Sequence, residues 1–162
     1  MSLRMVVMGV SGCGKSSVGE GVAVRLGIPY RDGDDLHPAE NVAKMRVGIP
    51  LTDADRWPWL DRVGQVLAGE APVIIGCSAL KRQYRDRIRA RAGGTVSFVY
   101  LEGSRDLIAG RMAERKGHYM PLTLLDSQFA ALEVPGPAEA ITVSINQPLD
   151  KIIQAILQNV SL

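Results

Sequence analysis

Residues 9–17 combine glycine, lysine and serine in a spacing that suggests phosphate chemistry. Gly9, Gly14, Lys15 and Ser16 stand in the frame G-x-x-x-x-G-K-S, between an apolar run and a helical pattern. Glycines at 9, 12 and 14 allow positive φ and let backbone N–H groups converge on phosphate oxygens. The motif therefore predicts a loop that holds a nucleoside triphosphate.

Each residue type in this loop has an expected role. The Lys15 ammonium can reach the β- and γ-phosphates in the transfer step, and the Ser16 hydroxyl is a hard oxygen ligand suited to Mg²⁺. The helix beginning near Lys15 adds the positive end of its dipole. The alternative is a glycine-rich turn that binds nothing. The residues expected to contact the nucleotide are Gly9, Val10, Ser11, Gly12, Cys13, Gly14, Lys15, Ser16 and Ser17.

Two acids follow the second apolar run. Asp32 and Asp34 lie two residues apart, and in an extended chain they point the same way. Parallel sheets bind ligands at the carboxyl ends of their strands, where these acids are expected. Asp32 is a candidate for Mg²⁺ or its bound water, and Asp34 for the base that takes a proton from an attacking hydroxyl. The alternative is a turn with solvated acids.

Basic side chains form two further groups. Lys81, Arg82 and Arg85 follow the third apolar run and are expected to grip a carboxylate or phosphate, whereas Arg89 and Arg91 are interpreted as a solvated face. A later group is expected to form a basic flap that closes over the transferring phosphate, and its alternative is a surface pair at helical spacing. Its members are Arg111, Arg115, Lys116 and His118.

Short apolar runs alternate with amphipathic segments, a pattern typical of a βαβα chain with a parallel sheet. We expect strands at 4–8, 29–31, 73–77, 96–101 and 140–145. We expect Gly27 to end the first helix, Ser104 to cap another, and Pro58 to lie in the first turn of its helix. The expected helices cover 15–25, 38–47, 56–68, 80–92, 104–115, 121–132 and 148–160.

Composition favours one globular enzyme-sized domain over 1–162. The chain is 46% hydrophobic and 22% charged, with a formal net charge of +2, which argues against nucleic acid as the main partner. We expect no membrane partner, because no apolar stretch approaches the length of a membrane span, and no signal peptide is recognised. The two cysteines do not suggest a disulfide framework, so a cytoplasmic location is expected.

Several segments together strongly resemble the gluconokinase family, over nearly the whole chain and in order. They are Gly9–Ser17, Asp32–Pro38, Gly48–Leu60, Cys77–Asp86, Arg115–Met120, Leu125–Phe129 and Leu132–Pro135. The resemblance implies an α/β P-loop NTPase fold with a five-stranded parallel sheet of order 2-3-1-4-5 flanked by helices. It also implies a mobile helical lid at about 105–133 and an acceptor-binding region at about 34–68.

The activity implied by this resemblance is ATP- and Mg²⁺-dependent phosphorylation of D-gluconate at its 6-hydroxyl, commonly by a homodimer. By similarity, Asp34 binds the acceptor and acts as base, while Lys15 and Arg115 are catalytic and Asp32 is a Mg²⁺ group. Arg111 is assigned to the nucleotide. The expected acceptor contacts are Asp34, His37, Arg46, Arg56, Lys81, Arg82, Arg85 and His118.

Other functions stay open at this point. One is a kinase for another small hydroxy acid such as shikimate, and another is a regulatory module that binds nucleotide without transferring phosphate. A nucleic-acid end kinase is a weaker alternative because the net charge is nearly neutral. The sequence further predicts that the Cys13 thiol, at a helix amino terminus beside Lys15, reacts readily when exposed.

Overall fold

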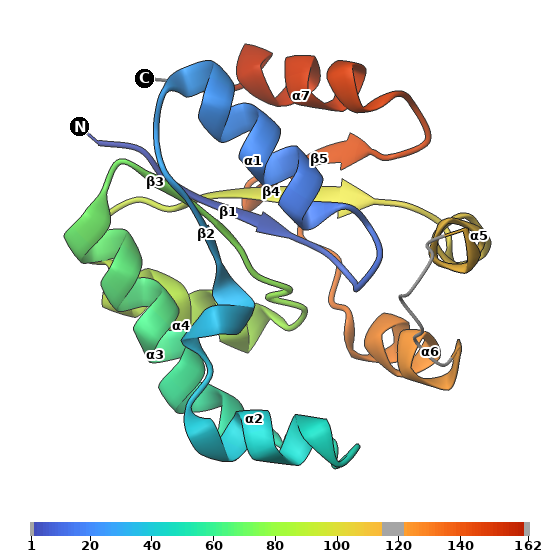
Figure 1. Ribbon diagram of the computed structural model, residues 1–162. Helices are drawn as coiled ribbons and strands as arrows, with labels where there is room; N and C mark the ends of the chain where they lie inside the picture. Colours follow the sequence, from blue (N-terminus) through green and yellow to red (C-terminus); the bar gives the residue numbers. More distant parts are fainter. Residues whose placement is uncertain (1, 115–121, 161–162) are drawn as a thin grey trace.

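The computed structural model describes residues 2–114 and 122–160, and its strands form one parallel sheet (Figure 1). The strands are β1 Arg4–Met8, β2 Tyr30–Asp32, β3 Val73–Gly76, β4 Ser97–Glu102 and β5 Ala140–Ser144. Their order is β2-β3-β1-β4-β5, and each neighbouring pair is parallel. The sheet order implied by the family resemblance is confirmed.

Helices cover both faces of this sheet. In Figure 1, α1 and α7 lie on one face and α3 and α4 on the other, while α2 projects below α3 and α5 and α6 lie toward the tips of the β1 and β4 arrows. None of the helices in the described ranges is long and apolar enough to cross a bilayer. The bounds are α1 Lys15–Leu26, α2 Ala39–Arg46, α3 Asp53–Glu70, α4 Arg82–Ala92, α5 Arg105–Ala113, α6 Leu122–Ala131 and α7 Leu149–Gln158, with a 3₁₀ helix η1 at Gly33–Leu36.

The central strand β1 supplies side chains to two hydrophobic layers. Met5 and Val7 pack with α1 and α7, whereas Val6 and Met8 pack with α3 and α4. Alternate residues of a strand point to opposite faces, so a strand covered on both sides is apolar throughout. This explains why the β1 and β3 segments read as continuous apolar runs.

The start of α3 differs from the expected position. The Thr52 hydroxyl accepts a hydrogen bond from the Asp55 N–H, and the Asp55 carboxylate accepts one from the Thr52 N–H. This capping box starts the helix at Asp53, three residues before the predicted start at Arg56. Pro58 therefore lies in the second turn and not in the first, on an exposed part of the helix.

Two expected helix ends are confirmed. Gly27 ends α1 in the left-handed conformation, with φ of 68°, and its N–H donates to the carbonyls of the preceding turn. The Ser104 hydroxyl accepts a hydrogen bond from the Leu107 N–H and caps α5.

Loops from three neighbouring strands meet at the carboxyl edge of the sheet. Residues 9–14 follow β1, η1 follows β2, and residues 77–81 follow β3. The Gly9 N–H donates to the Ser78 carbonyl at 3.3 Å, which ties the first loop to the third. Because strand order is fixed by the sheet, residues far apart in the sequence come together at this edge.

Candidate active site

The loop at 9–14 has the geometry of an anion cradle. Gly9, Gly12 and Gly14 have φ values of 148°, 83° and 97°, which other residues rarely adopt. Gly14 immediately precedes α1 and has no side-chain cap, so the first N–H groups of that helix stay available to an anion. The Lys15 ammonium lies over the loop, 3.0 Å from the Gly9 carbonyl oxygen and 3.1 Å from that of Val10. The arrangement concentrates positive potential where a phosphate would bind.

A glutamine from α6 contacts this loop. The Gln128 Oε1 accepts from the Ser11 N–H at 2.6 Å, and the Gln128 Nε2 donates to the Ser11 hydroxyl at 2.9 Å. Sequence reasoning assigned no role to Gln128, although it lies within the segment 125–129 that carries the family resemblance. The two hydrogen bonds connect α6 to the phosphate-binding loop.

The acids after β2 are arranged by a turn. One Asp32 carboxylate oxygen accepts from the Asp34 N–H at 2.9 Å and caps η1. The expectation that the two side chains share a direction in an extended chain is therefore wrong, because the backbone turns at Gly33. A Cβ on Gly33 would lie 2.4 Å from the Gly76 carbonyl oxygen, so only glycine lets this turn approach β3. The turn keeps Asp34 beside Asp32, whose carboxylate binds its N–H.

The environment of Asp34 raises the pKa of its carboxyl group. The surrounding protein removes part of its hydration and raises its pKa above the ordinary value, and the nearby Asp32 charge raises it further. The Lys15 charge acts in the opposite direction, so Asp34 lies within electrostatic range of this loop lysine. The side chain keeps an exposed surface, so a ligand can reach it. A more basic carboxylate is better suited to accept a proton.

Two of the predicted acceptor cations meet at one aromatic ring. The Arg56 guanidinium carbon and the Lys81 ammonium each lie 5.6 Å from the centre of the Tyr84 ring. Asp53 completes this Tyr84 cluster, because it accepts a hydrogen bond from the Tyr84 hydroxyl and lies 3.2 Å from the Lys81 ammonium. Burial and the Asp53 hydrogen bond raise the pKa of Tyr84 to about 12. Asp53 and Tyr84 were not predicted from the sequence.

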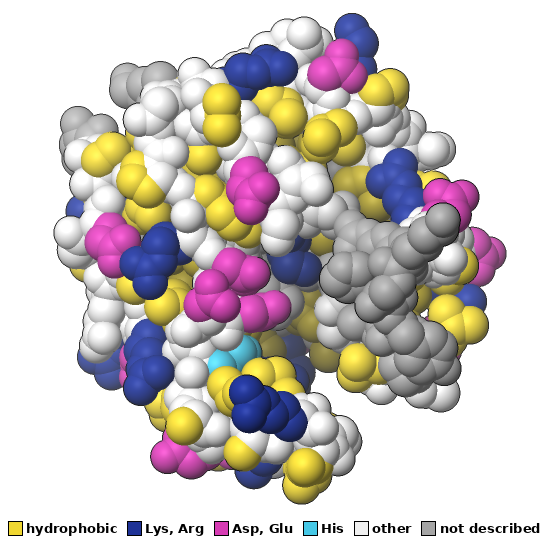
Figure 2. Space-filling model, viewed as in Figure 1, with side chains coloured by type: hydrophobic (Ala, Val, Ile, Leu, Met, Phe, Trp, Pro, Cys, Tyr) yellow, Lys and Arg dark blue, Asp and Glu magenta, His cyan; other side chains and the backbone are white. Residues whose placement is uncertain are grey.

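His37 lies on the chain between η1 and α2 and is half-buried. Its ring stacks on Trp59 with the ring centres 4.1 Å apart. The Trp59 indole N–H donates to the Gly33 carbonyl at 2.7 Å, so the same tryptophan supports both the acid-bearing turn and the histidine. Figure 2 shows acidic side chains beside a histidine on this face, with basic side chains deeper in the adjoining hollow. Trp59 thus links His37 to the acid-bearing turn.

The structure shows none of the remaining predicted cations that it describes at the Tyr84 ring. Arg46, at the end of α2, and Arg82, at the start of α4, are exposed. The Arg111 guanidinium donates to the Ile145 carbonyl at the end of β5. The predicted flap residues Arg115, Lys116 and His118 lie outside the described residues.

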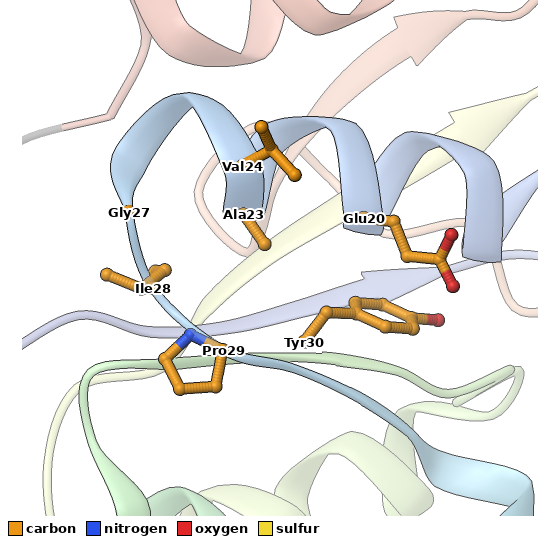
Figure 3. A pocket seen from close by; sticks show the side chains of 7 residues that line it. All are labelled: Glu20, Ala23, Val24, Gly27, Ile28, Pro29 and Tyr30. Atoms are coloured by element: carbon orange, nitrogen blue, oxygen red, sulfur yellow. The ribbon is translucent and has the colours of Figure 1, made fainter.

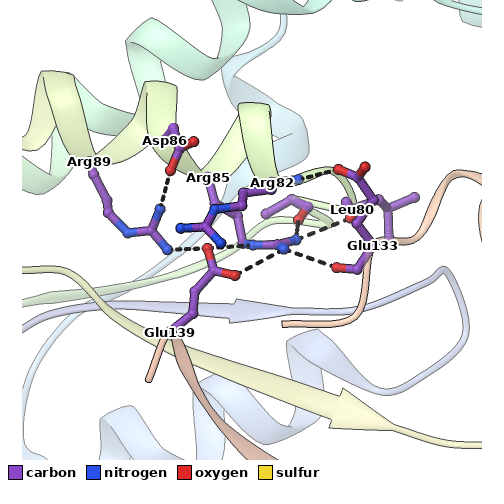
Figure 4. Close-up of polar contacts among 8 residues, drawn as sticks. Leu80, Arg82, Arg85, Asp86, Arg89, Glu133 and Glu139 are labelled. Carbon is purple, nitrogen blue, oxygen red and sulfur yellow. Dashed lines mark hydrogen bonds and ion pairs between the residues drawn. The ribbon is translucent and has the colours of Figure 1, made fainter. Parts of the chain in front are cut away.

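Arg85 is buried, contrary to the prediction that it grips the acceptor. It is only 1% exposed, and its guanidinium donates to the carbonyls of Ala79, Leu80 and Glu133 and to the Glu139 carboxylate (Figure 4). Sequence reasoning placed it on an open helical face, but the 133–139 segment covers this side of α4. Arg85 is therefore a structural residue and is not a contact for the acceptor.

The Arg85 network joins α4 to the segment that follows α6. Arg85 Nε lies 3.0 Å from one Glu139 oxygen, without the alignment of a hydrogen bond, and Arg89 also binds Glu139. Burial alone would raise the pKa of Glu139, but the hydrogen bonds from both arginines hold it below its usual value. The interpretation of Arg89 as a solvated residue is also wrong, since it bonds Asp86 and lies over the Phe98 ring.

The donor atoms near the loop fit a magnesium ion that arrives with phosphate. In the part of the chain that the structure describes, no cluster of three His, Cys, Asp or Glu residues could hold a metal. The Ser16 hydroxyl and the second Asp32 oxygen are hard ligands, and Mg²⁺ normally completes its shell with water and phosphate oxygens. The Tyr30 hydroxyl is buried nearby without a hydrogen bond of normal geometry among the described residues.

The two cysteines do not have the exposure that a reactive thiol needs. Cys13 is 2% exposed and Cys77 is 1% exposed. The Cys13 sulfur lies against Gly9, where an added Cβ would approach it to 2.7 Å. The prediction that Cys13 reacts readily depended on exposure, and its side chain instead packs beneath the loop.

A shallow hollow of about 380 Å³ lies elsewhere, beside the carboxyl-terminal half of α1 (Figure 3). Its lining is mainly apolar, with Val24, Ile28 and Pro29 at one end and Glu20 and Tyr30 at the other. None of the predicted nucleotide or acceptor residues lines it. This hollow is separate from the candidate active site.

Comparisons with known proteins agree with this geometry. The family model described as shikimate kinase matches residues 11–133. The gluconokinase of Gluconobacter oxydans is 46% identical over 96% of this chain and 89% of its own length, and the thermosensitive gluconokinase of Escherichia coli is 43% identical over 96% and 86%. The chain belongs to the gluconokinase family.

Solved structures support the same assignment. A gluconokinase from Sinorhizobium meliloti is 51% identical, with a TM-score of 0.90 over 97% of this chain and 90% of that one. A shikimate kinase from Bacteroides thetaiotaomicron is 17% identical with a TM-score of 0.70, a likeness that shows the fold alone. Gluconokinase relatives are thus far more similar in sequence than shikimate kinases, and the protein is a kinase with the P-loop NTPase fold.

Proposed function

We propose that this protein transfers the γ-phosphoryl group of ATP to the 6-hydroxyl of D-gluconate, forming 6-phospho-D-gluconate and ADP. The observation that carries the proposal is the position of Asp34, a carboxylate of raised pKa within electrostatic range of Lys15. The Asp34 carboxylate can accept the proton of a hydroxyl, and the Lys15 ammonium can bind a phosphate. An in-line transfer requires both. Similarity to gluconokinases over nearly the full length supports gluconate as the acceptor.

The residues of the loop have distinct roles in this proposal. The backbone N–H groups of the loop that are not already bonded to Ser78, Val10 or Gln128 bind phosphate oxygens. Lys15 moves from the Gly9 and Val10 carbonyls to the β- and γ-phosphates. Ser16 and Asp32 would hold Mg²⁺, which neutralises phosphate charge when bound. Asp34 accepts the proton of the attacking hydroxyl, and its like-charged neighbour Asp32 increases its basicity.

The gluconate carboxylate requires a cationic site away from Asp34. Arg56 and Lys81 come together at the Tyr84 cluster and supply two charges there. The Lys81–Asp53 pair is partly exposed, so a substrate carboxylate can compete with Asp53 for the ammonium. Arg46 and Arg82 are exposed, and we propose them as further cations for the same anion.

The other functional regions follow the family pattern. We assign residues 105–133 to a mobile lid carrying Arg111, Arg115 and His118, and residues 34–68 to acceptor binding. Arg115 supplies positive charge to the transferring phosphoryl group, and His118 contacts the acceptor. Closing such a lid excludes water from the reacting groups. The contact of Arg85 with Glu139 holds the segment that follows this lid against α4.

The remaining proposals concern the setting of the enzyme. We assign it to the cytoplasm as a homodimer, with neither nucleic acid nor membrane as a partner. A net charge of +2 supports the first exclusion, because nucleic-acid binding rests on strong positive potential. Phosphorylation of shikimate is not favoured, since the shikimate kinase structures share only 17% identity with this chain.

The position of the transferred phosphate tests this function. The purified protein is incubated with MgATP and D-gluconate, and the product is analysed by phosphorus–proton correlation NMR. We expect one new phosphate ester whose phosphorus couples to the two protons on carbon 6, with one ADP formed per ester. Coupling to a proton on another carbon, or ADP formation without an ester, would contradict the proposal.

A further inference from the structure

Asn41 is a buried polar residue in a helix whose neighbours are mostly exposed. It lies on α2 and is 3% exposed. Its side-chain nitrogen is 2.9 Å from the Asp55 carbonyl oxygen and 3.1 Å from His37 Nδ1. A backbone carbonyl only accepts hydrogen bonds, so the atom facing it must be the amide nitrogen. The Asp55 contact therefore fixes which way the Asn41 amide points.

This orientation determines where His37 carries its proton. One N–H of Asn41 is used by the Asp55 carbonyl, and the other is directed at His37 Nδ1. Nδ1 must then accept, which requires its lone pair, and a neutral imidazole protonated at Nε2 satisfies this condition. An imidazolium would place two N–H groups against each other. The neutral Nε2–H tautomer is the form that fits this contact.

The surrounding elements hold this arrangement in place. Asp55 belongs to the capping box of α3 and binds the Lys44 ammonium of α2 at 2.8 Å, so the carbonyl that orients Asn41 is itself fixed. Trp59 of α3 stacks on the imidazole with an angle of 17° between the rings. The histidine is therefore positioned from α2 on one edge and from α3 on one face.

The local electrostatics also favour the neutral form of the His37 ring. Burial, followed by the positive charge of Arg56, lowers the pKa of His37 from 6.5 to about 4. Asp34 and Asp35 lie on the adjoining η1, and Lys44 pairs with Asp55 behind Asn41. At neutral pH the ring is thus uncharged, which makes it unsuited to bind the substrate carboxylate as a cation. Its Nε2 has no hydrogen-bond partner in residues 2–114 and 122–160.

We infer that His37 recognises a hydroxyl oxygen of the acceptor through Nε2–H, and that Asn41 is the positioning residue that fixes this tautomer. The inference rests on the proposed function, because it assigns a polyol acid to the same site. The neutral Nε2–H donor suits a hydroxyl oxygen of the acceptor. The carboxylate of the acceptor is attracted instead to Arg56 and Lys81 of the Tyr84 cluster. His37 and Asp34 then contact different hydroxyl groups, one as donor and one as acceptor.

Nitrogen NMR of the imidazole tests the tautomer without any substrate. The chain contains two histidines, His37 and His118, so the spectrum of a His37→Gln variant assigns the signals. We expect His37 to show a protonated Nε2 and an unprotonated Nδ1 throughout about pH 5–8. In Asn41→Asp the carboxylate can only accept, so the proton should move to Nδ1. Protonation of Nδ1 in the wild-type protein, or titration near the ordinary pKa, would overturn the inference.

Kinetics of conservative variants test the donor role. The amide nitrogen of glutamine reaches the position of Nε2, whereas that of asparagine reaches only the position of Nδ1. We expect His37→Asn and Asn41→Asp to raise KM for gluconate about two- to twelvefold, the range for one neutral hydrogen bond, with KM for ATP unchanged. His37→Gln should restore most of the gluconate affinity. Asn159→Asp, an exposed change at the carboxyl-terminal cap of α7, serves as the control.

Different measurements test the phosphorylation of gluconate and the roles of His37 and Asn41. If gluconate is not phosphorylated while the Nε2–H tautomer is found, the proposed function fails and the Asn41 assignment stands. If gluconate is phosphorylated but His37→Asn and Asn41→Asp leave its KM unchanged in folded protein, the donor role is wrong. Circular dichroism and the melting temperature of each variant establish that it is folded.

Discussion

Gln128 of α6 and Ser11 of the phosphate-binding loop are joined by two reciprocal hydrogen bonds, although 117 residues separate them in the sequence. The contact places a side chain from the proposed lid directly on the loop that we propose binds the phosphates. It occupies both the N–H and the hydroxyl of Ser11. The stability of α6 and the state of the loop are therefore connected.

Removing the Gln128–Ser11 contact should loosen α6. Gln128→Leu removes both hydrogen bonds while keeping a side chain of similar size. Each such bond contributes about 0.5–1.5 kcal/mol, so amide hydrogen exchange in α6 should become at least about fivefold faster. Gln154→Leu, an exposed change on α7, should leave α6 exchange unchanged. Equal protection of α6 in both variants would show that the contact does not hold this helix.

Replacing Asp34 by asparagine separates its chemical role from its effect on folding. Loss of a general base should lower kcat by about 10²–10⁴-fold, with little change in KM for ATP. Asp35→Asn, in the adjacent position on η1, provides the control and should retain most of the turnover. An Asp34→Asn variant with normal kcat would remove this residue from the mechanism.

The same Asp34 variant should be more stable than the wild-type protein at neutral pH. The folded state raises the Asp34 pKa above 3.8, so ionisation of this group disfavours folding as the pH rises through that range. Asparagine avoids this cost. We expect a higher melting temperature for Asp34→Asn at pH 7, and the difference should disappear at a pH below the ordinary value. A lower melting temperature at neutral pH would contradict the sign of the shift.

Arg85 provides a prediction about stability alone. Removing one partner of a buried ion pair costs about 3–5 kcal/mol, so Arg85→Met should strongly lower the free energy of unfolding in urea. Arg91→Met on the same helix removes a more exposed pair with Asp61 and should cost about 0–1 kcal/mol. Adding Glu139→Leu to Arg85→Met should recover part of the loss. Similar costs for the two single variants would show that Arg85 is not buried as described.

Thiol labelling tests the packing beneath the phosphate-binding loop. Cys13 and Cys77 are both buried, and burial raises the pKa of Cys77 to about 12. A disulfide reagent at mildly alkaline pH should therefore label the native protein slowly, while both thiols should react at once in denaturant. Rapid native labelling of Cys13 would restore the interpretation of an exposed thiol at the helix amino terminus.

Much of the fold was predictable because its signals are local. Apolar runs located every strand to within a few residues, and Gly27 and Ser104 marked helix ends by their own chemistry. Thr52, Asp53 and Asp55 were recognised as caps for α3, but the helix begins directly after Thr52 and not at Arg56.

The site was predictable only in part, because burial and turns depend on distant segments. The burial of Arg85 by residues 133–139 and the folding of Asp34 back onto Asp32 have no local signal. Asn41 stands four residues after His37, a helical spacing that could have drawn attention to it. Gln128 is one polar residue among several on α6, and only the folded chain places it on Ser11.

Acceptor-stimulated ADP release at saturating MgATP is the most direct test of the central claim, that this site phosphorylates gluconate. The panel contains D-gluconate, shikimate and other sugar acids under the same conditions. The account predicts that kcat/KM for gluconate exceeds that for shikimate by at least about a hundredfold. A preference for shikimate, or ADP release that no acid stimulates, would contradict it.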